Sequence, residues 1–212
     1  MGLSSNALEW LFPSRCSLCG VVGLPPICDA CRSQFETEGS PHSLCGPLDY
    51  RLSAYWYESR AAMAVKRLKF NRCSSLASPM AQDLAKLIFR HGWADGMLVV
   101  PIPIHWTRRA WRGFNQAELL CEAIPPEILR PQWLRRTRPT RPQTTLSREE
   151  RARNLEGAFR ASPEVAGRDI LLVDDVVTTG QTAVQCAQAL KEFGANEVSL
   201  VTFAVSRGCA LR

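Results

Sequence analysis

The segment from Ile170 to Ala183, ILLVDDVVTTGQTA, constrains the fold more than any other part of the chain. Its first four residues are all apolar, which is typical of a short strand buried on both faces of a parallel sheet. Asp174 and Asp175 follow at the carboxyl end of that strand, where open α/β sheets bind their ligands. The segment therefore predicts an α/β fold with a ligand site at this edge of the sheet.

A loop rich in hydroxyl groups follows the two aspartates and leads into a helix predicted from Gln181 to about Phe193. Thr178, Thr179 and Thr182 supply the hydroxyls, and Gly180 gives the loop a sterically permissive backbone. The first amides of a helix and the positive end of its dipole suit a phosphate. Carboxylates beside such a loop predict a site for a sugar phosphate.

Other folds also place an acidic pair at the end of a strand, receiver domains among them. Only 37 residues follow Asp175 here, enough for one helix and one strand, whereas receiver domains carry most of their length after the acidic pair. The chain also lacks G-x-x-x-x-G-K-[ST] and G-x-G-x-x-G, so P-loop and dinucleotide sites lack their required residues.

An apolar strand, an acidic pair and T-T-G-x-T resemble the type I phosphoribosyltransferases, which bind phosphoribosyl pyrophosphate (PRPP). The resemblance implies that Asp174 and Asp175 accept hydrogen bonds from the ribose hydroxyls, while the loop holds the 5′-phosphate. The residues that it assigns to PRPP are Asp174, Asp175, Val176, Thr178, Thr179, Gly180, Gln181, Thr182 and Pro103.

Four separated motifs narrow the resemblance to the ComF family and span nearly the whole chain. They are Pro101-Ile102-Pro103 followed by Arg109-x-x-Arg112-Gly-Phe-Asn-Gln116, then Gln143-x-x-Leu146, Arg151-x-x-Asn154 and Gly157-Ala158-Phe159. Members of this family pair an amino-terminal zinc element with a phosphoribosyltransferase domain. The family is associated with natural competence and the handling of transforming DNA, which implies a setting rather than a reaction.

Transfer from PRPP must neutralise a departing pyrophosphate, and the resemblance implies that Mg²⁺ does much of this task. It makes the turn at Pro103, with Arg109 and Arg112 just beyond, the candidate pyrophosphate contact and assigns these arginines a catalytic role beside the acidic pair. The resemblance also implies a flexible lid that closes over the ligand, at residues 135–154, with Gln143, Arg151 and Asn154 as candidate contacts. That stretch is also typical of a solvated surface, since eight arginines lie between Arg130 and Arg153.

The cysteines gather near the amino terminus, with five of the nine in the first 45 residues. Cys16-x-x-Cys19 has the spacing of a zinc knuckle, and Cys28-x-x-Cys31 begins a helix predicted from Asp29 to about Phe35. Two such pairs in a chain expected in the cytoplasm predict one structural Zn²⁺ held by four thiolates.

A third pair, His42-x-x-Cys45, offers an alternative set of ligands. It would replace Cys28 and Cys31, form part of a second site, or bind nothing. The family pattern has a cysteine where this chain has His42, and this departure argues against a second zinc site.

The rest of the chain fits an α/β domain at residues 49–212 behind a zinc-binding element at residues 1–48. The domain is expected to have a mostly parallel central sheet flanked by helices. Strands are predicted at 50–57 and 97–100, and helices at 60–70 and 79–91, the second capped by Ser78 and stopped by Gly92. Asn115 and Glu118 are expected to cap a further helix reciprocally. Lys69 is a weak candidate for a phosphate contact and is taken as a surface lysine.

The chain contains no run of about 18 apolar residues, so we expect a cytoplasmic protein without membrane insertion. Its net charge of +6 favours polyanionic partners without choosing among them. Two classes of function stay open. One is a transferase that moves phosphoribosyl from PRPP to an unidentified acceptor. The other is a competence accessory that uses PRPP as a regulatory ligand and binds partner proteins or single-stranded DNA, the latter through the arginines at 135–138 and Trp133.

Overall fold

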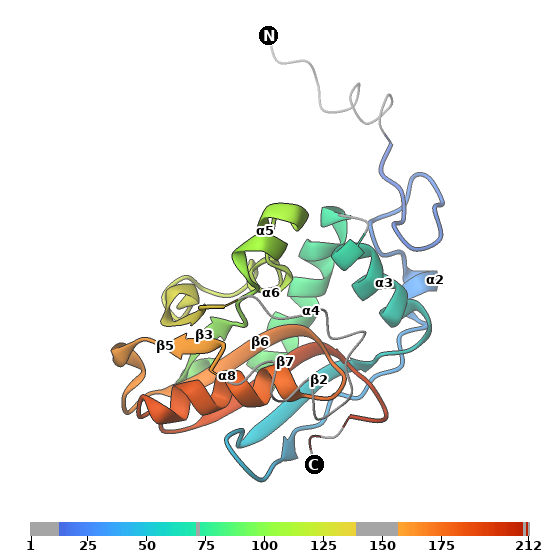
Figure 1. Ribbon diagram of the computed structural model, residues 1–212. Helices are drawn as coiled ribbons and strands as arrows, with labels where there is room; N and C mark the ends of the chain where they lie inside the picture. Colours follow the sequence, from blue (N-terminus) through green and yellow to red (C-terminus); the bar gives the residue numbers. More distant parts are fainter. Residues whose placement is uncertain (1–12, 71–72, 139–156, 210, 212) are drawn as a thin grey trace.

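The structure is a computed structural model that describes residues 13–70, 73–138, 157–209 and 211 (Figure 1). A five-stranded sheet forms its centre, with the strands in the order β1-β2-β7-β6-β3. The outermost strand, β1, runs antiparallel to β2, and the other four strands are parallel. The bounds are β1 His42–Ser43, β2 Tyr50–Trp56, β3 Met97–Pro101, β6 Asp169–Val177 and β7 Val198–Val205. This arrangement confirms the predicted α/β class and mostly parallel sheet.

Helices cover both faces of the sheet (Figure 1). Two of them, α3 (Ser59–Phe70) and α4 (Ala77–Arg90), pack in the same apolar cluster as Leu171 and Val173 of β6. On the other face, α8 (Gln181–Glu192) packs with Ile170 and Leu172. Because successive strand residues point to opposite faces, the unbroken apolar run of β6 serves both clusters.

Shorter elements complete the described chain. A separate antiparallel pair joins β4 (Leu134–Arg136) to β5 (Phe159–Ala161), and β5 contacts α8. The short α-helices are α2 (Asp29–Arg32), α5 (Trp106–Arg112) and α6 (Gln116–Leu119). Four 3₁₀ turns lie at Ser74–Leu76, Trp93–Asp95, Pro131–Trp133 and Pro163–Val165.

Several predicted boundaries are wrong, each for a local reason. The predicted helix from Asp29 ends at Arg32 rather than near Phe35. The helix predicted from Pro79 begins at Ala77, because the 3₁₀ turn before it continues directly into α4, so Ser78 lies inside the helix and does not cap it. The strand expected to end before the aspartates continues through them to Val177, because Asp174 and Val176 keep their register with β7.

The cap of α6 is half as predicted. The Asn115 side chain accepts a hydrogen bond from the amide of Ala117 at 3.2 Å, and its own amide group donates to the carbonyl of Ile102. Glu118 accepts from Arg109 at 2.9 Å, so the reciprocal cap is wrong.

The amino-terminal element is attached to the sheet and to α3. Within it, β1 pairs with β2, and Thr37 forms an isolated bridge with Tyr55. The domain boundary at residue 48 therefore stays a prediction. In the described part of the chain, no helix has both the length and the apolar character needed to cross a membrane.

Candidate functional site

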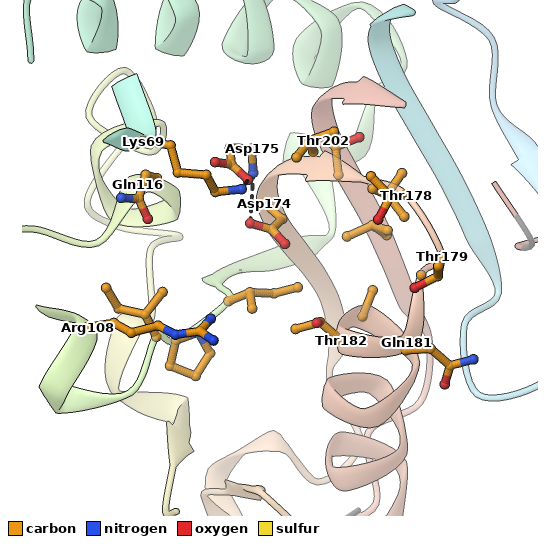
Figure 2. Close-up of a pocket in the computed structure, with 18 of the residues that line it drawn as sticks. Lys69, Arg108, Gln116, Asp174, Asp175, Thr178, Thr179, Gln181, Thr182 and Thr202 are labelled. Carbon is orange, nitrogen blue, oxygen red and sulfur yellow. Dashed lines mark hydrogen bonds and ion pairs between the residues drawn. The ribbon is translucent and has the colours of Figure 1, made fainter. Parts of the chain in front are cut away.

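A polar cavity of about 280 Å³ opens at the carboxyl ends of β3 and β6 (Figure 2). Its walls come from the chain beyond β2, the end of α3, the loop after β3, the helices α5 and α6, β4, β7 and the β6–α8 connection. The polar or charged side chains that line it are Tyr57, Lys69, Arg108, Arg112, Gln116, Arg136, Asp174, Asp175, Thr178, Thr179, Gln181, Thr182 and Thr202. The cavity therefore joins acidic, basic and hydroxyl groups at the ligand edge of a parallel sheet.

The loop between β6 and α8 forms one wall of this cavity. Gly180 sits at the amino-terminal cap of α8 with a φ of 77°, a left-handed conformation that glycine adopts without strain. The first bond of the helix runs from the amide of Val184 to the carbonyl of Gly180 at 2.9 Å. The first turn of α8, Gln181 to Ala183, thus presents the positive end of the helix dipole to the cavity.

The two aspartates differ in their surroundings. Asp175 is 2% exposed, and its Oδ1 accepts a hydrogen bond from Lys69 Nζ at 2.9 Å. Asp174 is half-buried, and its Oδ1 accepts from the backbone amide of Asp175 at 2.8 Å. Figure 2 shows the Lys69 side chain extending toward the two aspartates. Both carboxylates therefore line the cavity, and that of Asp175 is held in an ion pair with Lys69.

Electrostatics separate the pair further. Burial and the neighbouring Asp175 raise the pKa of Asp174 to about 7, although Lys69 acts in the opposite direction. Burial alone would lower the pKa of Lys69, but the two carboxylates raise it overall. Asp174 therefore changes charge near neutral pH while Lys69 stays protonated.

The basic wall comes from α5 and α6. Arg112 donates to Gln116 Oε1 at 2.9 Å and lies 5.6 Å from the centre of the Phe70 ring. Burial and Arg108 lower the pKa of Arg112, and the two aspartates offset part of that effect. Arg112 Nε, Gln116 Nε2 and Asp175 Oδ2 are buried and have no hydrogen-bond partner among the described residues. Buried polar atoms of this kind call for a ligand or ordered water.

All nine residues that the resemblance assigns to PRPP line the cavity, and so does Arg112 of the predicted catalytic pair of arginines. The nine are Pro103, Asp174, Asp175, Val176, Thr178, Thr179, Gly180, Gln181 and Thr182. Arg109 is exposed, lies outside the residues that line the cavity and pairs with Glu118 at 2.9 Å. The candidate lid residues Gln143, Arg151 and Asn154 lie outside the described part of the chain.

Several residues of the cavity are missing from the prediction. They are Tyr57, Arg108, Gln116, Arg136 and Thr202. The prediction that Lys69 is a surface lysine is wrong, since its side chain is 24% exposed and paired with Asp175. The signal in the sequence was its position at the end of an amphipathic helix with further basic residues in the last turn.

The four cysteines of the two C-x-x-C pairs come together, with their Sγ atoms within 4.8 Å of one another. Cys16 and Cys31 are 3.8 Å apart at sulfur, as are Cys19 and Cys28. Among the residues that the structure describes, this is the one His, Cys or carboxylate group of three or more that could hold a metal ion. Four thiols at this spacing are compatible with tetrahedral structural zinc.

Backbone turns hold the first pair of cysteines in position. The amide of Gly20 donates to the carbonyl of Cys16 at 2.8 Å, and the amide of Leu18 points to Cys16 Sγ at 3.4 Å. Although burial opposes it, such backbone hydrogen bonds lower the pKa of Cys16 to about 6. Burial and the neighbouring thiols raise the pKa of Cys31 to about 12. A cation is needed before all four sulfurs can ionise together.

The alternative ligands lie apart from this cluster. His42 Nε2 bonds to Glu38 Oε1, and Cys45 is exposed. Neither belongs to the metal-binding group found among the described residues, so the preferred set of four cysteines is the one that the structure assembles.

Comparison with known proteins identifies the fold that carries this cavity as a phosphoribosyltransferase domain. The family model described as "Phosphoribosyl transferase domain" matches residues 74–211. DNA utilization protein YhgH of Escherichia coli (strain K12) is 34% identical over 218 residues, covering 89% of this chain and 95% of that protein.

Competence protein F of Haemophilus influenzae is 32% identical over 108 residues, covering 48% of this chain and 47% of that protein. Among solved structures, the glutamine PRPP amidotransferase from B. subtilis aligns with a TM-score of 0.43 and 20% identity, over 66% of this chain and 30% of that chain. The transferase domain, the relatives and the four-cysteine cluster together show that the chain belongs to the ComF family.

Proposed function

We propose that this protein binds PRPP in the cavity at the end of β6 and transfers its phosphoribosyl group, with Mg²⁺, to an acceptor. The observation that carries the proposal is the meeting of an acidic pair, a helix-capping loop and a basic wall that holds buried, unpartnered polar atoms. Buried polar atoms without hydrogen bonds destabilise the free protein. A polar ligand that supplies the missing hydrogen bonds removes this penalty and so binds favourably.

In this proposal each wall of the cavity contacts a different part of PRPP. The carboxylates of Asp174 and Asp175 accept the ribose hydroxyls, and the loop at 178–182 takes the 5′-phosphate. The turn at Pro103 and the guanidinium of Arg112 face the pyrophosphate. Arg108 joins this wall from the same helix, whereas Arg109 keeps its expected role only if it leaves Glu118.

The chemistry asks for charge stabilisation more than for proton transfer. As the bond between ribose C1 and pyrophosphate breaks, negative charge gathers on the leaving group. Mg²⁺ bound with PRPP would neutralise part of that charge. Arg108 and Arg112 supply the remaining positive charge and orient the leaving group.

The amino-terminal cluster fits a structural rather than a catalytic metal in this proposal. Cys16, Cys19, Cys28 and Cys31 would fill all four positions of a Zn²⁺ ion, so no position is left for substrate. Two C-x-x-C pairs that converge on one candidate metal site are typical of a reducing compartment, which supports a cytoplasmic location. The names of the relatives support a setting in DNA uptake and utilization, with other competence proteins as partners.

Turnover is tested by pyrophosphate release. The protein is incubated with PRPP, Mg²⁺ and a panel of bases, nucleotides and oligonucleotides, with Asp174→Asn as the matched negative control. Release that depends on one acceptor and is absent in the variant supports the transferase. If the protein binds PRPP yet releases no pyrophosphate with any acceptor, PRPP is a regulatory ligand instead.

The second candidate is an accessory that binds single-stranded DNA, and α5 favours it. Trp106 and Trp111 on this helix are 71% and 61% exposed, and arginines lie between them. Exposed aromatic rings beside guanidinium groups suit stacked bases and a phosphate backbone. Trp133, which the sequence offered for this purpose, is only 9% exposed.

Fluorescence titration with a labelled oligonucleotide tests this candidate. Trp106→Ala with Trp111→Ala should weaken binding, and Arg135→Ala with Arg138→Ala should reduce its salt dependence. If all four substitutions leave both quantities unchanged, α5 and the exposed arginines Arg135 and Arg138 form no DNA path.

A further inference from the structure

Lys69 occupies a position that the proposed chemistry does not yet explain. It lies in the last turn of α3, and its Nζ is 2.9 Å from Asp175 Oδ1 (Figure 2). Its side chain is 24% exposed, and that of Asp175 is 2% exposed. Burying an ion pair costs free energy, so an arrangement of this kind needs a reason beyond stability.

The alternation of β6 explains why the pair is split. Leu171 and Val173 pack toward α3 and α4, whereas Ile170 and Leu172 pack toward α8. Neighbouring carboxylates in an extended strand point to opposite faces, so Asp175 follows the face that α3 covers. Asp174 is on the other face, within electrostatic reach of Cys186 of α8. The two aspartates cannot serve a ligand in the same way.

We propose that Lys69 is a positioning residue that neutralises Asp175 and fixes its orientation, so that Asp174 is the carboxylate left to accept hydrogen bonds from the ribose hydroxyls. This inference rests on the proposed function and sharpens it, because it gives the two aspartates different roles.

The charged groups around the pair agree with this division. Lys69 from α3 is the cation that contacts Asp175. Arg112 from α5 interacts with both carboxylates at longer range. The pKa of Tyr57, just beyond β2, is raised by burial, lowered by Lys69 and raised by Asp175. Lys69 also lowers the pKa of Asp174, against the effects of burial and Asp175. Without Lys69, Asp174 would hold its proton to higher pH and would accept hydrogen bonds from hydroxyl groups less well.

The first experiment needs no ligand. The ¹³C carboxyl signal of Asp174 is titrated by NMR in the wild-type protein, in Lys69→Gln, in Lys69→Arg and in Lys66→Gln, an exposed lysine one turn earlier on the same helix. We expect the midpoint of the Asp174 titration to rise by about one pH unit or more in Lys69→Gln. In the other two variants it should stay near the wild-type value. An unchanged midpoint in a folded Lys69→Gln protein overturns the inference.

The second experiment measures PRPP affinity with Mg²⁺ by calorimetry from pH 6 to pH 9. Lys69→Gln should bind about tenfold more weakly at pH 7 and regain affinity as the pH rises, and Lys69→Arg should rescue binding. An equal loss at every pH would contradict a positioning role. If the wild-type protein fails to bind PRPP, the proposed function fails, while the NMR titration still tests the inference.

A variant on the other side of the pair guards against a Lys69→Gln protein that does not fold. Asp175→Asn removes the negative charge beside Asp174, so the Asp174 midpoint should fall rather than rise. A rise or no change in this variant would count against the inference.

Discussion

Arg60 Nη1 of α3 donates a hydrogen bond to the backbone carbonyl of Leu18 at 3.0 Å. Arg67, two turns further along the helix, donates to the carbonyl of Ser17 in the same turn of chain. The helix then ends with Lys69 against Asp175. The helix α3 therefore contacts the four-cysteine element through Arg60 and Arg67 and the cavity through Lys69.

The metal should be lost when one cysteine of the cluster is replaced. We expect about one zinc per chain in the wild-type protein and none in Cys16→Ser, because three thiolates bind Zn²⁺ far more weakly than four. The loosened element should also weaken PRPP binding through α3. Elemental analysis and calorimetry measure the two effects. Cys45→Ser, an exposed cysteine outside the cluster, is the control, and zinc retained in Cys16→Ser would exclude the four-thiolate site.

The free protein should lose stability as the pH rises from about 4 to about 7. Burial and Asp175 raise the pKa of Asp174 to about 7, so within this window the folded state binds more protons than the unfolded state. The slope from this residue is up to about 1.4 kcal/mol per pH unit. Urea unfolding at pH 5 and pH 8 should show a smaller difference for Asp174→Asn than for the wild type, and equal differences would contradict the assignment.

Gly180 should tolerate no side chain. It has a φ of 77°, and a Cβ there would approach the Leu211 side chain to 2.3 Å. Gly180→Ala should cost about 1 kcal/mol or more and should lower PRPP affinity, because the phosphate loop must shift. Gly167→Ala is the matched control, since Gly167 has a φ of 68°, open space around it and no part in the cavity. Thermal unfolding with and without PRPP separates backbone strain from lost binding.

The two arginines of the R-x-x-R motif should differ in their effect. Arg112 lines the cavity, whereas Arg109 is exposed and paired with Glu118. Arg112→Gln should weaken PRPP binding about tenfold or more, and Arg109→Gln should change it less than twofold, as expected for a surface ion pair. Calorimetry with pyrophosphate alone gives an independent check. An equal loss in both variants would mean that Arg109 reaches the ligand.

The sequence allowed the class of fold and the centre of the site to be predicted because strong local patterns carried them. The apolar run before Asp174 is typical of a buried strand, and the threonine-glycine loop after Asp175 is typical of a short turn into a helix. The cysteine spacing likewise favoured the four ligands that the structure brings together, although it left His42 and Cys45 open as an alternative pair.

What the sequence could not give is the phase of short helices and the contacts between distant segments. The helix α5 has only seven residues and no apolar stripe, so its sequence does not indicate which of Arg108 and Arg109 faces the cavity. Lys69 and Asp175 are 106 residues apart, and their pairing depends on how α3 lies across the end of β6. Periodicity describes one element at a time, so such contacts become visible only in the folded chain.

The central claim is that the acidic pair and the loop after it bind PRPP. Calorimetric titration of PRPP with Mg²⁺ into the wild-type protein and into Asp174→Ala with Asp175→Ala tests it most directly. We predict saturable binding at about one PRPP per chain in the wild type, and none in a double variant that keeps its circular dichroism spectrum. Binding of equal strength in both proteins, or none in the wild type, would contradict the account.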